Sequence, residues 1–382
     1  EKYYQVFEQH KHSLTTTLVA SIQNDIYQAK VRNYPSALAH ALFSENIPSS
    51  VYGNLIDTVE DNLGELSRYY DYRRTKLGVD SLRLYDTYVA LVGVPEVRIS
   101  YEQAISMIVE AVSPLGTEYQ EVLHRGLTSD RWVDPYENKG KRSGAYSSGY
   151  HDSPPYILLN YDEKDIRNLF TLAHEAGHSM HSYYARRTQP YHYSNYSIFV
   201  AEVASTLNEQ LLSAHLRKHY ANDPTMLRYL VNQQLDDIKA TLHRQAMFAD
   251  FERWTHNELE EHRPLTVDSM RAYYHTLLEK YFGPSLSITP LDELEFLRIP
   301  HFYWAFYVYK YATGISASIA LAEPILSGDK EACRRYLAFL SEGGSDCSLS
   351  ILARAGVDLA TPTPVKKAIE LFGKLLAQLQ QL

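Results

Sequence analysis

Two histidines and a glutamate in the segment His174–His178 have the residue types and the spacing of a catalytic metal site. In an α-helix, positions i and i+4 lie on the same face, so the imidazoles of His174 and His178 can converge on one ion. Glu175 directly follows the first histidine and would lie beside the water on that ion, where a general base is needed. This H-E-x-x-H pattern is typical of zinc-dependent peptidases.

A catalytic zinc needs a third protein ligand, and Glu202 is the candidate that follows the histidines. It stands among small and apolar residues in the segment Phe199–Glu209. An unpaired carboxylate there is costly unless a cation compensates its charge, so a metal bond is a natural explanation. Glu209 lies seven residues on, on the same helical face, and could orient a ligand imidazole.

A purely structural interpretation of these residues remains open at this point. The two histidines could be hydrogen-bonded core residues on a helix that packs against tyrosines. Glu202 could be a solvated residue at the edge of a core helix, and Glu209 a plain surface residue. The combination of the histidine pair with a carboxylate in apolar surroundings favours the metal site.

A second candidate for chemistry, His301, follows Pro300 and precedes a run of aromatic residues. Periodicity alone indicates a core helix, or a helix entered from a turn. Within this run, Tyr303, Tyr307 and Tyr311 recur at four-residue steps and are expected to share one helical face. The residues by themselves do not assign these side chains a catalytic role.

Four separated segments of the chain together match one known family of enzymes: His174–His181, Phe199–Glu209, Asn138–Gly149 and Ile299–Gly314. They resemble the oligoendopeptidase F group of the thimet-oligopeptidase-like (M3) family of zinc metallopeptidases, and the similarity extends over essentially the whole chain. The resemblance implies a mostly helical enzyme that cleaves short peptides inside a deep channel with one Zn²⁺ ion per chain. It also implies that the N-terminal part of family members lies outside this sequence, which is therefore expected to be the catalytic region of a longer enzyme.

A mechanism follows from these parts. Zinc held by the two histidines and Glu202 would acidify its water and polarise the scissile carbonyl. Glu175 would take the proton of that water as a base and then deliver it to the leaving amine as an acid. The resemblance implies that His301 and a tyrosine stabilise the oxyanion, with Tyr311 as the first choice and Tyr307 as the second.

Two other functions are weighed against a zinc endopeptidase. A zinc carboxypeptidase on a similar helical scaffold would remove single C-terminal residues instead of cleaving internal bonds. A non-catalytic fragment could hold zinc and peptide without turnover. Glu175 argues against the latter, because a binding protein has no need of a general base.

The elements that must position these residues are predicted to be mainly helices. We expect a helical zincin-type fold with a deep cleft between two helical lobes, residues 1–130 and residues 131–382. A small β-ribbon beside the zinc helix is expected from Tyr156–Tyr161, with Gly144–Gly149 as its partner strand. The zinc helix follows Asp162–Asp165, because apolar residues recur there at helical spacing. Other helices are predicted at residues 51–73, 100–113, 115–127, 223–262, 269–281, 329–342 and 364–382, the second opened by a capping box at Ser100.

Composition excludes some partners. A net charge of −9 and a pI near 6.0 argue against nucleic acid, which normally needs a basic face. Cys333 and Cys347 are the only cysteines and are most simply reduced thiols, consistent with a cytosolic protein. The most apolar run, Ile315–Leu326, is too short to cross a membrane. Short peptides are the expected partners, and the sequence leaves the oligomeric state open.

Overall fold

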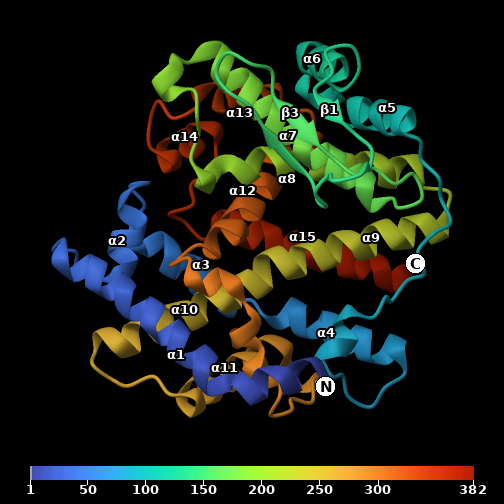
Figure 1. The fold of residues 1–382 in the computed structure, drawn as a ribbon. Coiled ribbons are helices and arrows are strands. Elements are labelled where there is room, and N and C mark those ends of the chain that lie inside the picture. The colour runs from blue at the N-terminus through green and yellow to red at the C-terminus, as the bar shows by residue number, and fades with distance from the viewer. Residues whose placement is uncertain (1) are drawn as a thin grey trace. The chain divides into compact units, whose positions relative to one another are not determined.

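Most of the chain is α-helical in the computed structural model, which describes residues 2–382 (Figure 1). The strands assigned among these residues form one small sheet. The predicted mainly α class with a small β-ribbon is therefore confirmed. None of the helices in residues 2–382 combines the length and the apolar composition that a membrane span requires.

The described chain divides into two compact units, each built from two separate stretches of sequence. The first unit contains the chain up to Leu91 together with Asp236–Ala312. The second unit contains Val92–Leu235 and Thr313–Leu382. The boundary predicted near residue 130 therefore falls inside the second unit.

The reason for this difference is the packing of α5 (Tyr101–Ala111) and α6 (Thr117–Leu127). Both helices contact α7 (Arg167–Thr188), and α5 also contacts α8 (Ile198–His219). An amphipathic helix shows in its sequence that it has an apolar face, but not which helix will cover that face. The capping box predicted at Ser100 is present and opens α5, with the Ser100 hydroxyl accepting from the amide of Gln103.

The first unit is helical throughout its described elements. The predicted helix at residues 51–73 is divided in two around Asp61–Leu63, where the chain turns. The predicted helix at 223–262 is interrupted by a π-helical turn at Lys239–His243. The α-helices of the unit are α1 (Lys2–Val31), α2 (Ala37–Phe43), α3 (Ser49–Glu60), α4 (Gly64–Leu77), α10 (Arg244–Glu260) and α11 (Val267–Phe282).

The second unit is organised around the contact between α7 and α8, the most extensive helix pair in the described chain. Strands β2 (Tyr146–Ser148) and β3 (Tyr156–Leu158) both contact α7. Figure 1 shows β3 beside this helix. The other helices of this unit are α13 (Lys330–Glu342), α14 (Ser348–Ala355) and α15 (Thr363–Gln381). Two helices run across the boundary between the units, α9 (Pro224–Ile238) and α12 (Tyr309–Leu326).

The sheet has the strand order β1-β3-β2. β2 pairs antiparallel with β3, and Ser147 lies opposite Ile157. The predicted ribbon beside the zinc helix is thereby confirmed. β1 (Val133–Asp134) adds a parallel pairing to β3 that the sequence did not indicate, because two residues are too few for an alternating pattern.

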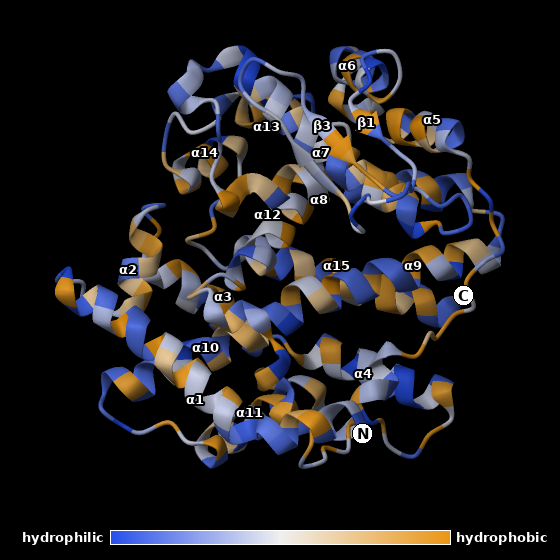
Figure 2. Cartoon of the chain, viewed as in Figure 1, coloured by the Kyte–Doolittle hydropathy of each residue, from blue (hydrophilic) through white to orange (hydrophobic). Residues whose placement is uncertain are grey.

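The helices hold together through their apolar faces. α15 is an example of a helix with one apolar face. Hydrophobic and hydrophilic residues alternate along it in Figure 2. Its apolar residues recur every three or four positions and are buried: Val365, Ile369, Phe372, Leu376 and Leu379. This spacing places them on one face of the helix.

Candidate metal centre

α7 presents His174 and His178 one turn apart on the same face. Their Nε2 atoms lie 3.2 Å from each other. Both side chains are partly buried, with 26% and 17% of their surface exposed. Two imidazole nitrogens directed at one point, with limited access to water, form the beginning of a metal site.

α8 brings the carboxylate of Glu202 to the same point. Oε2 of Glu202 lies 3.4 Å from Nε2 of His174 and 3.6 Å from Nε2 of His178. The three side chains offer ligand atoms that all lie within 4.8 Å of one another. The structure therefore brings together the three metal ligands predicted from the sequence.

The spacing of these donors fits a zinc ion. For ligands about 2.0–2.1 Å from a tetrahedrally coordinated zinc, simple geometry separates the donor atoms by about 3.3 Å. The observed separations of 3.2, 3.4 and 3.6 Å agree with this value. Two imidazoles and one carboxylate are also the donor types of a catalytic zinc site, which leaves a fourth position open.

Glycine at position 177 permits the close approach of α7 to α8. A Cβ atom on Gly177 would lie 2.6 Å from the carbonyl oxygen of Ala204 and 2.7 Å from Cα of Ser205. Ordinary carbon contacts are at 3.5–4.0 Å, so a larger residue would push the helices apart. The side-chain amide of Asn208 donates a 3.2 Å hydrogen bond to the backbone carbonyl oxygen of Ala173 and so joins the same two helices.

A second set of residues orients the ligands. Nδ1 of His174 lies 2.7 Å from Oε1 of Glu209, so the carboxylate accepts a hydrogen bond from an Nδ1–H group, and this tautomer leaves Nε2 free for a metal. The Ser205 hydroxyl donates to Oε2 of Glu202 over 3.0 Å. A Cβ on Gly314 would lie 3.2 Å from Cβ of Glu202, so α12 closely backs this ligand.

The electrostatics of the site favour the metal-binding forms of Glu202 and His178. Burial opposes protonation of His174, but the hydrogen bonds with Glu202 and Glu209 outweigh it and raise its pKa, so a metal would have to displace a proton from this imidazole. Burial opposes ionisation of Glu202, but the hydrogen bond with His174 and the nearby imidazoles outweigh it and lower its pKa to about 2. Burial and the neighbouring His174 lower the pKa of His178 to about 4. An ionised carboxylate and a neutral imidazole are the forms that bind metal.

Glu175 lies next to the ligands and is buried, with 7% of its surface exposed. Burial raises the pKa of its carboxyl group, and the neighbouring His174 and, to a smaller extent, the nearby backbone of Ser147 oppose this effect. Ser147 lies on β2, and its hydroxyl shares a 2.8 Å hydrogen bond with that of Ser179 on α7. The sheet is thus joined to the helix that carries the candidate base. A raised pKa suits a group that must both accept and release a proton.

His301, Tyr307 and Tyr311 form a cluster near the end of the second stretch of the first unit. The ring of His301 lies 6.2 Å from that of Tyr307 and 6.0 Å from that of Tyr311, centroid to centroid. The rings of Tyr307 and Tyr311 are 5.4 Å apart. The structure therefore groups these three candidates with one another.

The expectation that Tyr303, Tyr307 and Tyr311 share a helical face is wrong. Tyr303 ends a short 3₁₀ turn, Pro300–Tyr303, and α12 begins only at Tyr309. Between them Phe306 has a φ of 54°, a left-handed conformation that interrupts a helix. The amide of Phe306 donates to Oε1 of the buried Glu252 over 2.7 Å, a contact between residues distant in sequence that periodicity cannot reveal.

Sequence reasoning did not single out Gly177, Ser205, Gly314 or Ser147. The small residues Ala176 and Gly177 inside the H-E-x-x-H pattern were a signal for close helix packing. Ser205 follows Glu202 by three positions, where a helical side chain reaches its neighbour. Gly314 and Ser147 carried no local signal, because their contacts join distant segments.

Among known proteins, the family model described as Peptidase family M3 matches residues 1–371 of this chain. The oligopeptidase PepF of Bacillus subtilis is 44% identical over 379 residues, which cover 99% of this chain and 56% of the relative. An oligoendopeptidase F homolog of Borreliella burgdorferi is 42% identical over 381 residues, 100% of this chain and 64% of the relative. The crystal structure of oligoendopeptidase-F from Enterococcus faecium superposes with a TM-score of 0.80 at 34% identity, covering 99% of this chain and 61% of that one. The chain thus spans less than two thirds of the length of these proteins.

Proposed function

Because the chain belongs to peptidase family M3, we propose that it is a zinc-dependent endopeptidase that hydrolyses internal bonds of short peptides. The observation that carries this proposal is the arrangement of His174, His178 and Glu202 at zinc-ligand spacing, with the buried Glu175 beside them. The names of the relatives agree with it, since they are called oligopeptidase and oligoendopeptidase. The alternative of a non-catalytic binding protein gives Glu175 no purpose.

His174, His178 and Glu202 would hold one zinc ion, and Glu209 would keep the proton of His174 on Nδ1. Zinc supplies Lewis acidity, which makes a water acidic near neutral pH and polarises a peptide carbonyl. Glu175 accepts a proton from the attacking water and returns it to the leaving amine. Its buried position favours the protonated form that the second transfer requires.

His301 and Tyr311, with Tyr307 as the alternative to Tyr311, are proposed to donate hydrogen bonds to the oxyanion. The support for these roles is the resemblance of the segment to the family pattern and the clustering of the three rings. One such donor is worth about 3 kcal/mol in transition-state stabilisation. Replacing Tyr311 by Phe should therefore lower kcat, with a smaller effect on KM.

The proposal is tested by the hydrolysis of an internally quenched peptide of roughly ten residues, a length suited to an oligopeptidase. Cleavage should stop on addition of a chelator and return with zinc. Mass spectrometry of the products separates the candidate functions, since internal cleavage supports an endopeptidase and stepwise loss of C-terminal residues supports a carboxypeptidase. No cleavage by zinc-loaded chain would contradict the proposal for this segment.

Glu175→Gln tests the general base. The variant keeps the size and the hydrogen-bonding capacity of the side chain but cannot accept a proton, so turnover should fall by at least 10²-fold while zinc content stays near one ion per chain. Glu121→Gln, an exposed carboxylate on α6, is the matched control and should retain full activity. Full activity in Glu175→Gln would refute the assignment of the base.

A cytosolic location remains a prediction. Cys333 and Cys347 are both free thiols in the structure. Free thiols agree with a reducing compartment, where disulfides rarely persist. Short peptides are proposed as the partners of the chain because the family is a family of peptidases.

A further inference from the structure

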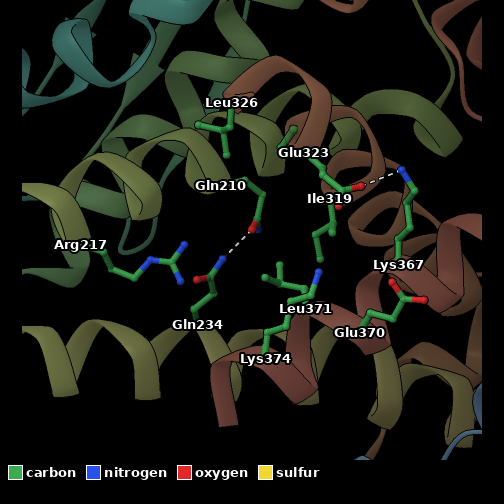
Figure 3. A pocket seen from close by; sticks show the side chains of 11 residues that line it. Gln210, Arg217, Gln234, Ile319, Glu323, Leu326, Lys367, Glu370, Leu371 and Lys374 are labelled. Carbon is green, nitrogen blue, oxygen red and sulfur yellow. Dashed lines mark hydrogen bonds and ion pairs between the residues drawn. The ribbon is translucent and has the colours of Figure 1, made fainter. Parts of the chain in front are cut away.

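A pocket of about 220 Å³ opens in the second unit. Figure 3 shows it between α8, α12 and α15, with Gln234 of α9 at its wall. None of the proposed metal ligands, nor Glu175, lines it. The pocket has a polar end, an apolar wall and a charged rim, and each of these parts restricts what it can hold.

Arg217 forms the charged part of the polar end. It lies in the last turn of α8, where a positive charge is favourable near the negative end of the helix dipole. The helix dipole accounts equally well for Lys218 and His219, which are exposed. It does not explain why the side chain of Arg217 is turned inward. Within the part of the chain that the structure describes, no side chain or carbonyl group forms an ion pair or hydrogen bond with Arg217. Burial without a compensating acid lowers its pKa.

An amide pair lies beside this guanidinium. Nε2 of Gln234 donates to Oε1 of Gln210 over 2.7 Å, and the Ser213 hydroxyl holds Oε1 of Gln234 over 3.1 Å. Both glutamines are buried. Among the described residues, the NH₂ group of Gln210 donates no hydrogen bond. Figure 3 shows the guanidinium of Arg217 directed toward this pair. The end of the pocket therefore offers several N–H donors and one uncompensated positive charge.

The opposite wall is apolar. Ile319 and Ala322 on α12 are buried, Leu326 is partly exposed at the mouth, and Leu371 on α15 faces them across the pocket. These residues make no hydrogen bonds with their side chains, so they suit an aliphatic group. A ligand that satisfies both ends must have an anionic head and an apolar body.

The charges at the rim set the net charge of the ligand. Lys367 and Glu323 form a 2.7 Å ion pair with each other. Lys374 and Glu370, both exposed, contribute one charge of each sign. With Arg217 included, three cations face two carboxylates, which leaves a surplus of one positive charge. A ligand with one negative charge would balance it.

We propose that this pocket binds a small aliphatic compound that carries a single carboxylate, with the carboxylate on Arg217 and Gln210 and the aliphatic group on Ile319, Leu326 and Leu371. A carboxylate matches the planar fork of a guanidinium and can accept two parallel hydrogen bonds from it. The volume limits the size of the ligand, since 220 Å³ equals the space of about seven waters at ~30 Å³ each. The inference does not depend on peptidase activity.

Two sources share this chemistry, a free short-chain acid and the C-terminal residue of a peptide. Isovalerate is the probe for the first source, and N-acetyl-leucine is the probe for the second. Binding is measured by isothermal titration calorimetry on the zinc-loaded chain, with neutral isovaleramide in parallel. Saturable binding of either acid, at least roughly tenfold stronger than that of isovaleramide, supports the proposal. The acid that binds more tightly identifies the source.

Variants then locate the binding. Arg217→Gln should weaken binding of the acid roughly tenfold or more, because it removes a charge-assisted hydrogen bond. Lys218→Gln, the matched control, removes a positive charge from the neighbouring exposed residue and should leave binding unchanged. Leu326→Glu, at the partly exposed mouth, should also weaken binding by repelling the carboxylate, and its exposure makes misfolding less of a concern.

Three results would overturn the proposal. The first is that neither acid binds. The second is equal binding to wild type and Arg217→Gln, which would place the carboxylate elsewhere, such as on the metal. The third is binding of chloride as tightly as isovalerate, which would mean that the apolar wall contributes nothing. Circular dichroism of each variant establishes that loss of binding is not loss of fold.

Discussion

Glu202 and Glu209 lie seven residues apart on one helix and contact the same histidine through different nitrogens. Glu202 approaches Nε2 of His174 at 3.4 Å, where a metal would lie, whereas Glu209 accepts from Nδ1 at 2.7 Å. The first side chain would therefore bind the ion and the second would only orient a ligand. This difference predicts different consequences when each is replaced.

Glu202→Ala should abolish zinc binding, because it removes one of the three donors. Metal content after dialysis, measured by atomic emission, tests this prediction. Glu121→Ala, on the exposed side of α6, is the control and should keep its zinc. A full complement of zinc in Glu202→Ala would mean that the third ligand lies elsewhere.

Glu209→Gln should weaken zinc binding without abolishing it. The amide oxygen can still accept from His174, but the negative charge that makes the imidazole a better donor is lost. Residues of this type typically contribute 10–100-fold in metal affinity. Competition with a chelator of known affinity measures the change, and an unaltered dissociation constant would contradict an orienting role for Glu209.

At the scale of the element, the approach of α7 to α8 depends on the absence of a side chain at Gly177. Gly177→Ala should destabilise the protein by about 1–3 kcal/mol, the usual cost of overpacking, and lower zinc affinity because the histidines move away from Glu202. Denaturant unfolding and zinc titration measure the two effects. Gly53→Ala is the control, because the added methyl group on α3 meets nothing within 4 Å and should stabilise by roughly 0.5–1 kcal/mol.

The backbone conformation of the segment that carries His301 and Tyr307 depends on a buried carboxyl group. Its left-handed residue, Phe306, is held by Glu252, and burial raises the pKa of that carboxyl group to about 8 although the Phe306 amide favours its ionised form. Between pH 4.5, the ordinary pKa of a glutamate, and about pH 8, Glu252 stays protonated in the folded chain but ionises in the unfolded chain. The folded state then binds more protons, so stability falls as the pH rises through this window.

We therefore expect Glu252→Gln to flatten the pH dependence of stability between pH 5 and 8. The contribution of one such group is at most about 1.4 kcal/mol per pH unit. Denaturation midpoints across this range test the expectation, with Glu261→Gln, an exposed residue just after α10, as the control. Identical pH profiles for wild type and Glu252→Gln would show that the buried group does not titrate in this window.

At the scale of the whole molecule, each compact unit is assembled from two stretches of sequence, and the chain passes between the units three times, after Leu91, Leu235 and Ala312. The zinc ligands come from one stretch of the second unit, whereas Gly314, which backs Glu202, comes from the other. A metal bound to α7 and α8 is thus linked to the packing of both stretches. Zinc should therefore stabilise the fold as a whole.

Zinc at a thousand times its dissociation constant should add about 4 kcal/mol to the free energy of unfolding. Differential scanning calorimetry with zinc and with a chelator measures the rise in Tm. Glu202→Ala supplies the control, since its Tm should be the same under both conditions. Equal Tm values for the zinc-loaded and the chelated wild type would contradict a metal held by α7 and α8.

The sequence by itself determined the features that depend on near neighbours. The i, i+4 spacing of His174 and His178, the capping box at Ser100 and the end of α13 before Gly343 all follow from interactions within a single turn or two of helix. The β2–β3 ribbon followed from composition and turn residues. Such features can be predicted from the sequence because they depend only on interactions within the local backbone.

Only the tertiary structure decided which faces meet. It assigned α5 and α6 to the unit of the metal helices, brought Gly177 against Ala204, and gathered Arg217 and Leu371 around one pocket. It also broke the predicted tyrosine face by holding Phe306 in a left-handed conformation through Glu252. These outcomes depend on the summed packing of residues far apart in the chain, and local periodicity carries no record of them.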